Sequence, residues 1–285
     1  MSERLVAEEA QTLFEFLARR LEGWKRNTLR ERLREGRVSV NGATVKRGNH
    51  VLGVGDEVEV AGREPAATRV PAKLVILYED ERLIAIDKPA GLLSVSTDRG
   101  GDRTALTLVR AALSTPGRPA HLWPVHRLDR ETSGVLLLAR TRAACDALRE
   151  RWSEARKTYL AIVEGAPEPP QGTIEQPLWE DAALNVRVGP GPEAKDARTR
   201  YRTLKVAGPR TLLEVELDTG RRHQIRAHLA WLGHPVAGDE RHGTRGPRLG
   251  LHALRLEVPR PGGEEPLVLE APAPRAFLAL LEPRA

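Results

Sequence analysis

The chain has 285 residues, of which 45 are Lys or Arg and 39 are Asp or Glu, so its formal net charge at pH 7 is +6. This length favours about two domains, and hydrophobic and charged fractions of 40% and 29% exclude a disordered or fibrous chain. The longest apolar runs, 135–139 and 276–281, fall far short of the roughly 20 residues of a transmembrane helix. We therefore expect no association with a membrane.

Arginine supplies most of the cationic side chains, and its planar guanidinium group favours an anionic partner because it matches phosphate with two parallel hydrogen bonds. The single cysteine, Cys145, excludes an internal disulfide and a thiolate metal cage. The first residues include several glutamates and lack the apolar stretch of a signal peptide. These features together predict a cytoplasmic protein.

Residues 11–62 have the pattern of a small α+β unit. Four apolar residues at helical spacing predict a first helix: Leu13, Phe14, Leu17 and Leu21. A second helix is predicted over 28–34 and ends at Gly36, and strands are predicted over 38–40, before an Asn-Gly turn, and over 57–60, after a Gly-Asp turn. Between residues 19 and 37, eight Lys or Arg and three Glu predict a basic helical face.

A proline-punctuated stretch divides the chain, so we predict a small domain over 1–64, a linker over 65–71 and a larger domain over 72–285. Strands of the larger domain are predicted over 74–78, 83–87, 135–139, 159–163, 200–206, 212–217 and 251–258. Its helices are predicted over 105–113, 142–155 and 224–232. Because strands outnumber helices and several are joined by short turns, we expect an α+β fold with a mixed, largely antiparallel sheet.

Chemistry is indicated most clearly by residues 125–134, Val-His-Arg-Leu-Asp-Arg-Glu-Thr-Ser-Gly, which precede an apolar strand. Asp129 lies between two arginines on a turn rich in hydroxyl groups, and those neighbours favour an ionised carboxylate that could act as a nucleophile. From the residues alone, the commoner alternative also stays open, in which a turn aspartate only accepts hydrogen bonds from the backbone.

The string His-Arg-Leu-Asp-x-x-Thr-Ser-Gly-x-x-Leu-Leu closely resembles the active-site signature of RluA-type pseudouridine synthases. Further segments resemble other motifs of that family in the same order: 87–92, 157–161, 219–229, 233–235, 238–239 and 251–253. The N-terminal unit is similar to the RNA-binding module named after small-subunit ribosomal protein S-four. The resemblance implies isomerisation of uridine within an RNA chain, without a metal or any other cofactor.

The resemblance also implies roles for four residues. Asp129 is the expected nucleophile or base, Tyr159 stacks on the base and assists proton movement, and Arg226 pairs with Asp129. Arg127 fills the space that the flipped uridine leaves in the RNA. A half-buried strand tyrosine and an exposed helical arginine are the structural alternatives for Tyr159 and Arg226.

Contacts with RNA phosphates are expected from further residues: Arg26, Arg30 and Arg34 in the small domain, and Lys88, Arg221, Arg222 and His223 in the large one. His126 is expected to support the catalytic turn through hydrogen bonds. The histidines of residues 223–242 lack the spacing of a zinc site, so no metal is predicted.

Two segments depart from the family pattern. Ser94-Val95-Ser96 stands where a histidine is common, and Glu240-Arg241-His242 stands where an aromatic residue often follows the Gly-Asp pair. The target RNA therefore stays open: the appended small domain favours large-subunit ribosomal RNA, and transfer RNA is the alternative. A non-catalytic protein for RNA binding or ribosome assembly is a further hypothesis, and a monomer is the default expectation.

Overall fold

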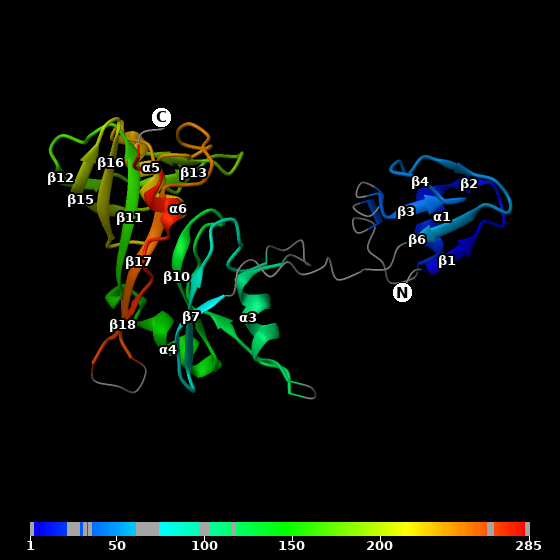
Figure 1. The fold of residues 1–285 in the computed structure, drawn as a ribbon, viewed down its shortest axis with the longest axis horizontal. Coiled ribbons are helices and arrows are strands. Elements are labelled where there is room, and N and C mark those ends of the chain that lie inside the picture. Colours follow the sequence, from blue (N-terminus) through cyan, green and yellow to red (C-terminus); the bar gives the residue numbers. More distant parts are fainter. Residues whose placement is uncertain are drawn as a thin grey trace. The chain divides into compact units, whose positions relative to one another are not determined.

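The computed structural model describes residues 3–21, 29–30, 33, 36–60, 74–96, 103–115, 118–260 and 265–282. The chain divides into two compact units, Met1–Ala72 and Lys73–Ala285 (Figure 1). The segment predicted as a linker lies outside the described residues, as do Arg26 and Arg34.

The first unit contains a four-stranded antiparallel sheet in the order β1 (Glu3–Val6), β6 (Glu57–Val60), β3 (Val38–Val40) and β4 (Ala43–Thr44). A second, two-stranded sheet pairs β2 (Gln11–Thr12) with β5 (Val51–Leu52). Helix α1 (Leu13–Arg20) begins at a capping box formed by Thr12 and Glu15. Apolar side chains of this helix and of β3 and β6 share one buried cluster, which is the core of the unit.

The two predicted turns of this unit are tied to each other. Asn41 has a φ of 50° and is followed by Gly42 at 80°, as the expected Asn-Gly hairpin turn requires. The Asn41 side chain donates to Asp56 Oδ1 at 2.8 Å and accepts from the Glu57 amide at 2.9 Å. Described parts of the second predicted helix are limited to Leu29, Arg30 and Leu33, and all three are helical.

The second unit is built on one large sheet. Its main path runs β12 (Gln171–Glu175), β15 (Arg198–Ala207), β16 (Arg210–Leu217), β11 (Arg156–Glu164), β17 (Leu251–Val258), β10 (Ser133–Ala139), β8 (Leu83–Lys88) and β7 (Val75–Glu79). Two more strands pair off this path, β18 (Leu267–Glu270) with β17 and β9 (Trp123–Pro124) with β10. Within the sheet, β10 and β17 pair in parallel, and the other pairs are antiparallel. The predicted α+β fold is confirmed.

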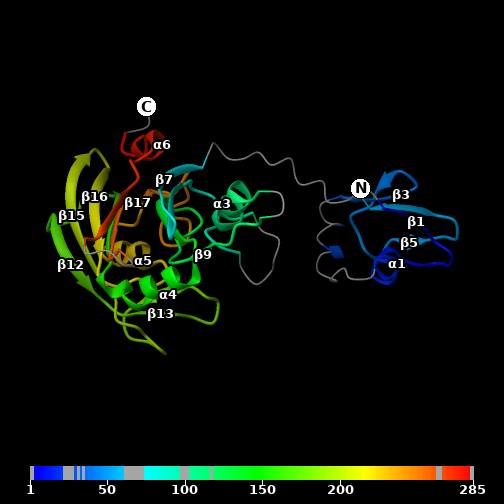
Figure 2. The ribbon, with the colours of Figure 1, turned by 90° about the horizontal axis from the view of Figure 1, so that it is seen from below.

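Helices cover both faces of the sheet (Figure 2). On β10, alternate side chains share clusters with α3 (Ala105–Leu113) and with α4 (Arg142–Glu150), which explains why this strand is apolar throughout. On β11, one face packs against α5 (Gln224–Trp231) and the other against α6 (Arg275–Leu278). The helix predicted over 142–155 ends at Glu150, because Arg151 leaves helical geometry and a short 3-10 turn, Trp152–Glu154, follows.

The parallel pairing of β10 with β17 depends on Gly134. This residue has a φ of +112°, and a Cβ atom built on it would lie 2.1 Å from the carbonyl oxygen of Ala253. We therefore expect Gly134→Ala to lower the free energy of unfolding by at least about 3 kcal/mol in urea denaturation, because strain and overlap add. Gly208→Ala is the control: its φ is +59° and nothing lies within 4 Å. A loss no larger than that of the control would contradict this account.

Candidate active site

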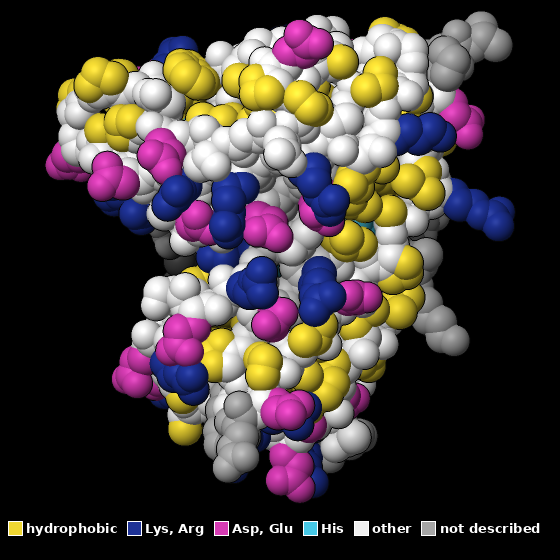
Figure 3. Space-filling view, turned by 90° about the vertical axis from the view of Figure 1, so that its left-hand side faces the viewer, with side chains coloured by type: hydrophobic (Ala, Val, Ile, Leu, Met, Phe, Trp, Pro, Cys, Tyr) yellow, Lys and Arg dark blue, Asp and Glu magenta, His cyan; other side chains and the backbone are white. Residues whose placement is uncertain are grey.

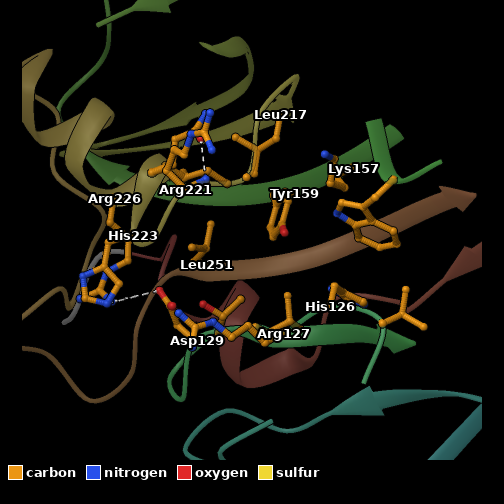
Figure 4. Close-up of a pocket in the computed structure, with 17 residues that line it drawn as sticks. His126, Arg127, Asp129, Lys157, Tyr159, Leu217, Arg221, His223, Arg226 and Leu251 are labelled. Carbon is orange, nitrogen blue, oxygen red and sulfur yellow. Dashed lines mark hydrogen bonds and ion pairs between the residues drawn. The ribbon is translucent and has the colours of Figure 1, made fainter. Parts of the chain in front are cut away.

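A pocket of about 280 Å³ lies where β11 and β17 meet the segment that precedes β10 (Figure 4). Its lining comes from four segments of the sequence: Val125, His126, Arg127, Leu128, Asp129 and Thr132; Trp152, Lys157 and Tyr159; Leu217, Gly220, Arg221, His223, Gln224, Ile225 and Arg226; and Leu251. The three motifs containing the predicted catalytic residues are therefore brought together by the fold. Asp129 is 29% exposed and is open to a ligand in this pocket.

The backbone around Asp129 is held by the segment that follows β8. Ser94 Oγ donates to the carbonyl of Leu128 at 2.8 Å and accepts from its amide at 3.0 Å. On the other side of Asp129, the carbonyl of Arg130 accepts from the amide of Gly91 at 2.8 Å. Ser94, which lies in a segment that departs from the family pattern, thus fixes the turn that contains Asp129.

Lys88 belongs to this support and not to an RNA interface. Its side chain is fully buried, and Nζ donates to the carbonyls of Pro89, Leu92 and Arg130. Burial lowers the pKa of Lys88 to about 8. The prediction that Lys88 contacts phosphate is wrong, because a buried ammonium group that is hydrogen-bonded to three carbonyls cannot reach RNA.

His126 supports the same turn, as expected. Its Nε2 accepts a hydrogen bond from the amide of Leu137 at 3.0 Å, and its ring stacks on Trp152 with centroids 5.1 Å apart. Burial lowers the pKa of His126 to about 4. The imidazole is therefore neutral at pH 7 and is an acceptor toward the backbone.

Arg226 joins two carboxylates. Its Nε and one terminal nitrogen donate to the two oxygens of Asp239, each at 2.7 Å, and the other terminal nitrogen donates to Asp129 Oδ2 at 3.2 Å. Burial disfavours the guanidinium cation, but the hydrogen bonds with both carboxylates outweigh it and raise the pKa of Arg226. The predicted pairing of Arg226 with Asp129 is thus present. The orientation of Arg226 is fixed by its two hydrogen bonds to Asp239.

Asp239 lies in a segment that resembles a family motif, and the sequence does not predict a role for it. The structure buries it completely, and it also accepts hydrogen bonds from the amides of Arg241 and His242. Although burial favours the neutral acid, Arg226 keeps the pKa of Asp239 below its ordinary value. The signal for Asp239 in the sequence was an acidic residue directly after Gly238 in a family motif. The sequence does not show that its partner is Arg226.

Tyr159 lies in the pocket on β11 and packs against two of the apolar clusters. Pairing between β11 and β17 shifts by one residue next to it, so that Leu254 has no partner opposite. Burial and the nearby carboxylate of Asp129 raise the pKa of Tyr159. Its phenol is therefore protonated at neutral pH.

His223 faces Asp129 instead of the solvent. Its φ is 50°, its Nε2 lies 3.8 Å from Asp129 Oδ2, and its ring meets that of His242 edge-on. Burial lowers the pKa of His223 to about 4, against the opposing effect of Asp129. At pH 7 this histidine is therefore a neutral residue of the pocket lining, and its contact with phosphate stays a prediction.

The remaining predicted RNA contacts differ in their surroundings. Arg221 donates to the carbonyl of Asp196, and Arg222 pairs with Glu180 on strand β13 (Leu178–Glu180), which forms a hairpin with β14 (Val186–Val188). Arg127 is exposed at the pocket, and no hydrogen bond joins it to another described residue. Arg30 in the first unit is exposed, and its guanidinium carbon lies 5.2 Å from the ring centroid of Phe14.

Lys and Arg are interspersed with Asp and Glu on the face of the second unit seen in Figure 3. On β15, three exposed arginines each pair with acidic side chains of β12, β16 or the residue after it: Arg198, Arg200 and Arg202. Such pairs neutralise the charge locally, so these three arginines give β15 little net positive charge.

No helix in the described ranges is long and apolar enough to cross a membrane. Within the same ranges, no group of three or more His, Cys, Asp or Glu side chains has the arrangement of a metal site.

Comparison with known proteins agrees with this geometry. A family model for RNA pseudouridylate synthase matches residues 82–231, and a model for the S4 domain matches residues 11–58. The ribosomal large subunit pseudouridine synthase C of Salmonella typhimurium is 34% identical over 98% of this chain and 94% of its own length. The ribosomal large subunit pseudouridine synthase D of Nitrosomonas europaea is 35% identical over 93% and 82%. The structure of human RNA pseudouridylate synthase domain containing 1 matches with a TM-score of 0.61 and 25% identity, over 73% of this chain and 86% of that one.

Proposed function

This chain belongs to the RNA pseudouridylate synthase family, and from that membership we propose that it isomerises uridine to pseudouridine in large-subunit ribosomal RNA, with Asp129 as the nucleophile or base. It is an RNA pseudouridine synthase, which sets aside the hypothesis of a non-catalytic RNA-binding protein. We assign the site on one observation: the partly exposed carboxylate of Asp129 is ion-paired with the buried Arg226 at the wall of the pocket.

The reaction breaks the bond between N1 of uracil and C1′ of ribose, and forms a bond between C5 and C1′. The proton on C5 is lost and N1 gains one, so atoms balance without an oxidant or reductant. The carboxylate of Asp129 is paired with Arg226 and can attack an electrophilic carbon or accept a proton. Because Arg226 gives its two other donors to Asp239, it orients Asp129 without reorganisation during the reaction.

Tyr159 supplies the surface on which the uracil ring stacks. Its raised pKa means that the hydroxyl is a proton donor at neutral pH, so we assign to it a hydrogen bond to the reacting base. Extrusion of a uridine from folded RNA costs a few kcal/mol of stacking. Arg127 is exposed beside Asp129 and is our candidate to fill the vacated space in the RNA.

Large-subunit ribosomal RNA is proposed because the relatives named above act on it according to their names, and because the S4 domain precedes the catalytic unit here. Sequencing-based mapping of pseudouridines in a strain without this gene tests the target. We expect one or a few positions of large-subunit ribosomal RNA to lose the modification and to regain it when the gene is restored. Loss confined to transfer RNA would overturn the proposed target but not the reaction.

Deletion of residues 1–64 tests the part that the small domain plays in binding. If Arg26, Arg30 and Arg34 contact phosphates, the truncated chain should bind RNA more weakly, with a salt dependence of log K shallower by about 2. Titration of RNA binding from 0.05 to 0.3 M salt measures that slope, and circular dichroism checks that the catalytic unit is folded. An unchanged slope would count against phosphate contacts by this domain.

A further inference from the structure

Lys157 lines the pocket together with three arginines, Arg127, Arg221 and Arg226. It lies two residues before Tyr159 on β11, so both side chains leave the same face of the sheet, roughly 6.6 Å apart along the strand. Both line the pocket, and Figure 4 shows Tyr159 between Asp129 and Lys157. Lys157 therefore lies at the end of the pocket away from the reactive carboxylate.

The surroundings of the Lys157 ammonium group are aromatic and neutral. Its Nζ lies 6.0 Å from the ring centroid of Trp152, which in turn stacks on the neutral imidazole of His126. Among the described residues, no hydrogen bond or ion pair satisfies this nitrogen. Burial lowers the pKa of Lys157, and the carboxylate of Asp218 opposes the shift only in part.

The other half-buried or buried cations at this site are satisfied. Lys88 donates to three carbonyl groups, and Arg226 is bonded to two carboxylates. A charge removed from water is costly unless it is paired, so an ammonium group left without an anion at a pocket wall indicates that the anion comes with the ligand.

We propose that Lys157 binds a phosphate group of the RNA that flanks the target uridine when the flipped nucleotide occupies the pocket. This inference rests on the proposed function, because it requires an RNA chain in the pocket. Phosphate is the group of RNA that has a full negative charge, and a compact ammonium binds it as a point charge. Trp152 and His126 form the floor of this phosphate subsite and keep the lysine stem directed toward the pocket.

The test uses the full-length chain with Asp129→Asn, so that RNA binds without being converted. Lys157→Met removes the ammonium group and keeps an unbranched apolar stem, Lys157→Arg keeps the charge, and Lys205→Gln removes a charge from an exposed position outside the pocket. The probe is a fluorescein-labelled fragment of large-subunit ribosomal RNA that contains the mapped uridine. Fluorescence anisotropy between 0.05 and 0.3 M salt gives Kd and its salt slope.

Lys157→Met should raise Kd about tenfold and make the salt slope shallower by about 0.7, as expected for one lost phosphate contact on a single strand. Lys157→Arg should keep the salt slope of Asp129→Asn alone, and Lys205→Gln should change neither quantity. Equal slopes for Lys157→Met and Lys205→Gln would overturn the phosphate subsite. If Lys157→Met lowers the midpoint of thermal unfolding by more than a few degrees, Lys157→Gln replaces it.

Tritium release by the wild-type chain from the same fragment distinguishes failure of the phosphate subsite from failure of the proposed function. Release, together with an unchanged slope for Lys157→Met, would refute the subsite alone. Without any release, the proposed function itself would fail. In the catalytically intact chain, Lys157→Met should raise KM and leave kcat at saturating RNA within about threefold, because the lost contact is made equally before and during the reaction.

Discussion

Asp129→Asn should lower kcat at least about 10⁴-fold while leaving the fold and RNA affinity close to those of the wild type. The amide is nearly the same size as the carboxylate, so packing around it should change little. It cannot serve as an anionic nucleophile or as a base, however, and its interaction with Arg226 loses the ion pair. Single-turnover measurement of tritium release from RNA labelled at uridine C5 gives the rate directly.

Glu131→Gln is the matched control for this substitution. It removes a carboxylate two residues away in the same turn, exposed and only loosely paired with Arg130 at 3.6 Å. We expect its kcat to stay within about threefold of the wild-type value. An Asp129→Asn variant that is as active as Glu131→Gln would place the chemistry on another residue.

Asp239→Asn should both destabilise the protein by about 3 kcal/mol and lower kcat by about 10²-fold or more. The substitution leaves the buried guanidinium of Arg226 without the bidentate partner that is 2.7 Å from each of its two donors. Arg226 is then free to move toward Asp129 or away from it, and the geometry of the catalytic pair is lost. Urea denaturation measures the first effect, and single-turnover kinetics measures the second.

Asp146→Asn is the matched control, because Asp146 pairs with Arg142 on the exposed surface of α4. Its effect on the free energy of unfolding should stay below about 0.5 kcal/mol. If Asp239→Asn lowers the free energy of unfolding no more than the control does and leaves kcat unchanged, Arg226 does not depend on Asp239 for its orientation.

The pKa of Asp239 also predicts how stability depends on pH. Because its pKa is lower in the folded state than in the unfolded chain, this carboxylate contributes stability above its ordinary pKa of about 4. That contribution is lost as the pH falls through the lower pKa of the folded protein. The free energy of unfolding of Asp239→Asn should therefore decrease less between pH 5 and pH 3 than that of the wild type.

The central strands were predictable because their patterns are strong. The run of apolar residues in β10 and the alternation in β16 indicate strands without any knowledge of their neighbours, and all seven predicted strands of the second unit are present. The shorter strands of this unit were missed: β9, β12, β13, β14 and β18. They have at most five residues each, so a period of two has little room to show in the sequence.

The candidate site was predictable as far as motifs define it. Asp129, Tyr159 and Arg226 come from separate motifs and line one pocket. Predictions failed where burial decides the role of a charged residue. Lys88 looks like a phosphate ligand in the sequence, but the tertiary structure buries it and surrounds it with backbone carbonyls.

We propose that this chain converts uridine to pseudouridine in large-subunit ribosomal RNA and that this conversion requires Asp129. This proposal is tested most directly by incubating the purified protein with such RNA, labelled with tritium at uridine C5 and isolated from a strain that lacks the gene. Tritium should be released in stoichiometric amount per modified site by the wild-type chain and not by Asp129→Asn. No release by the wild-type chain, or equal release by both, would contradict the account.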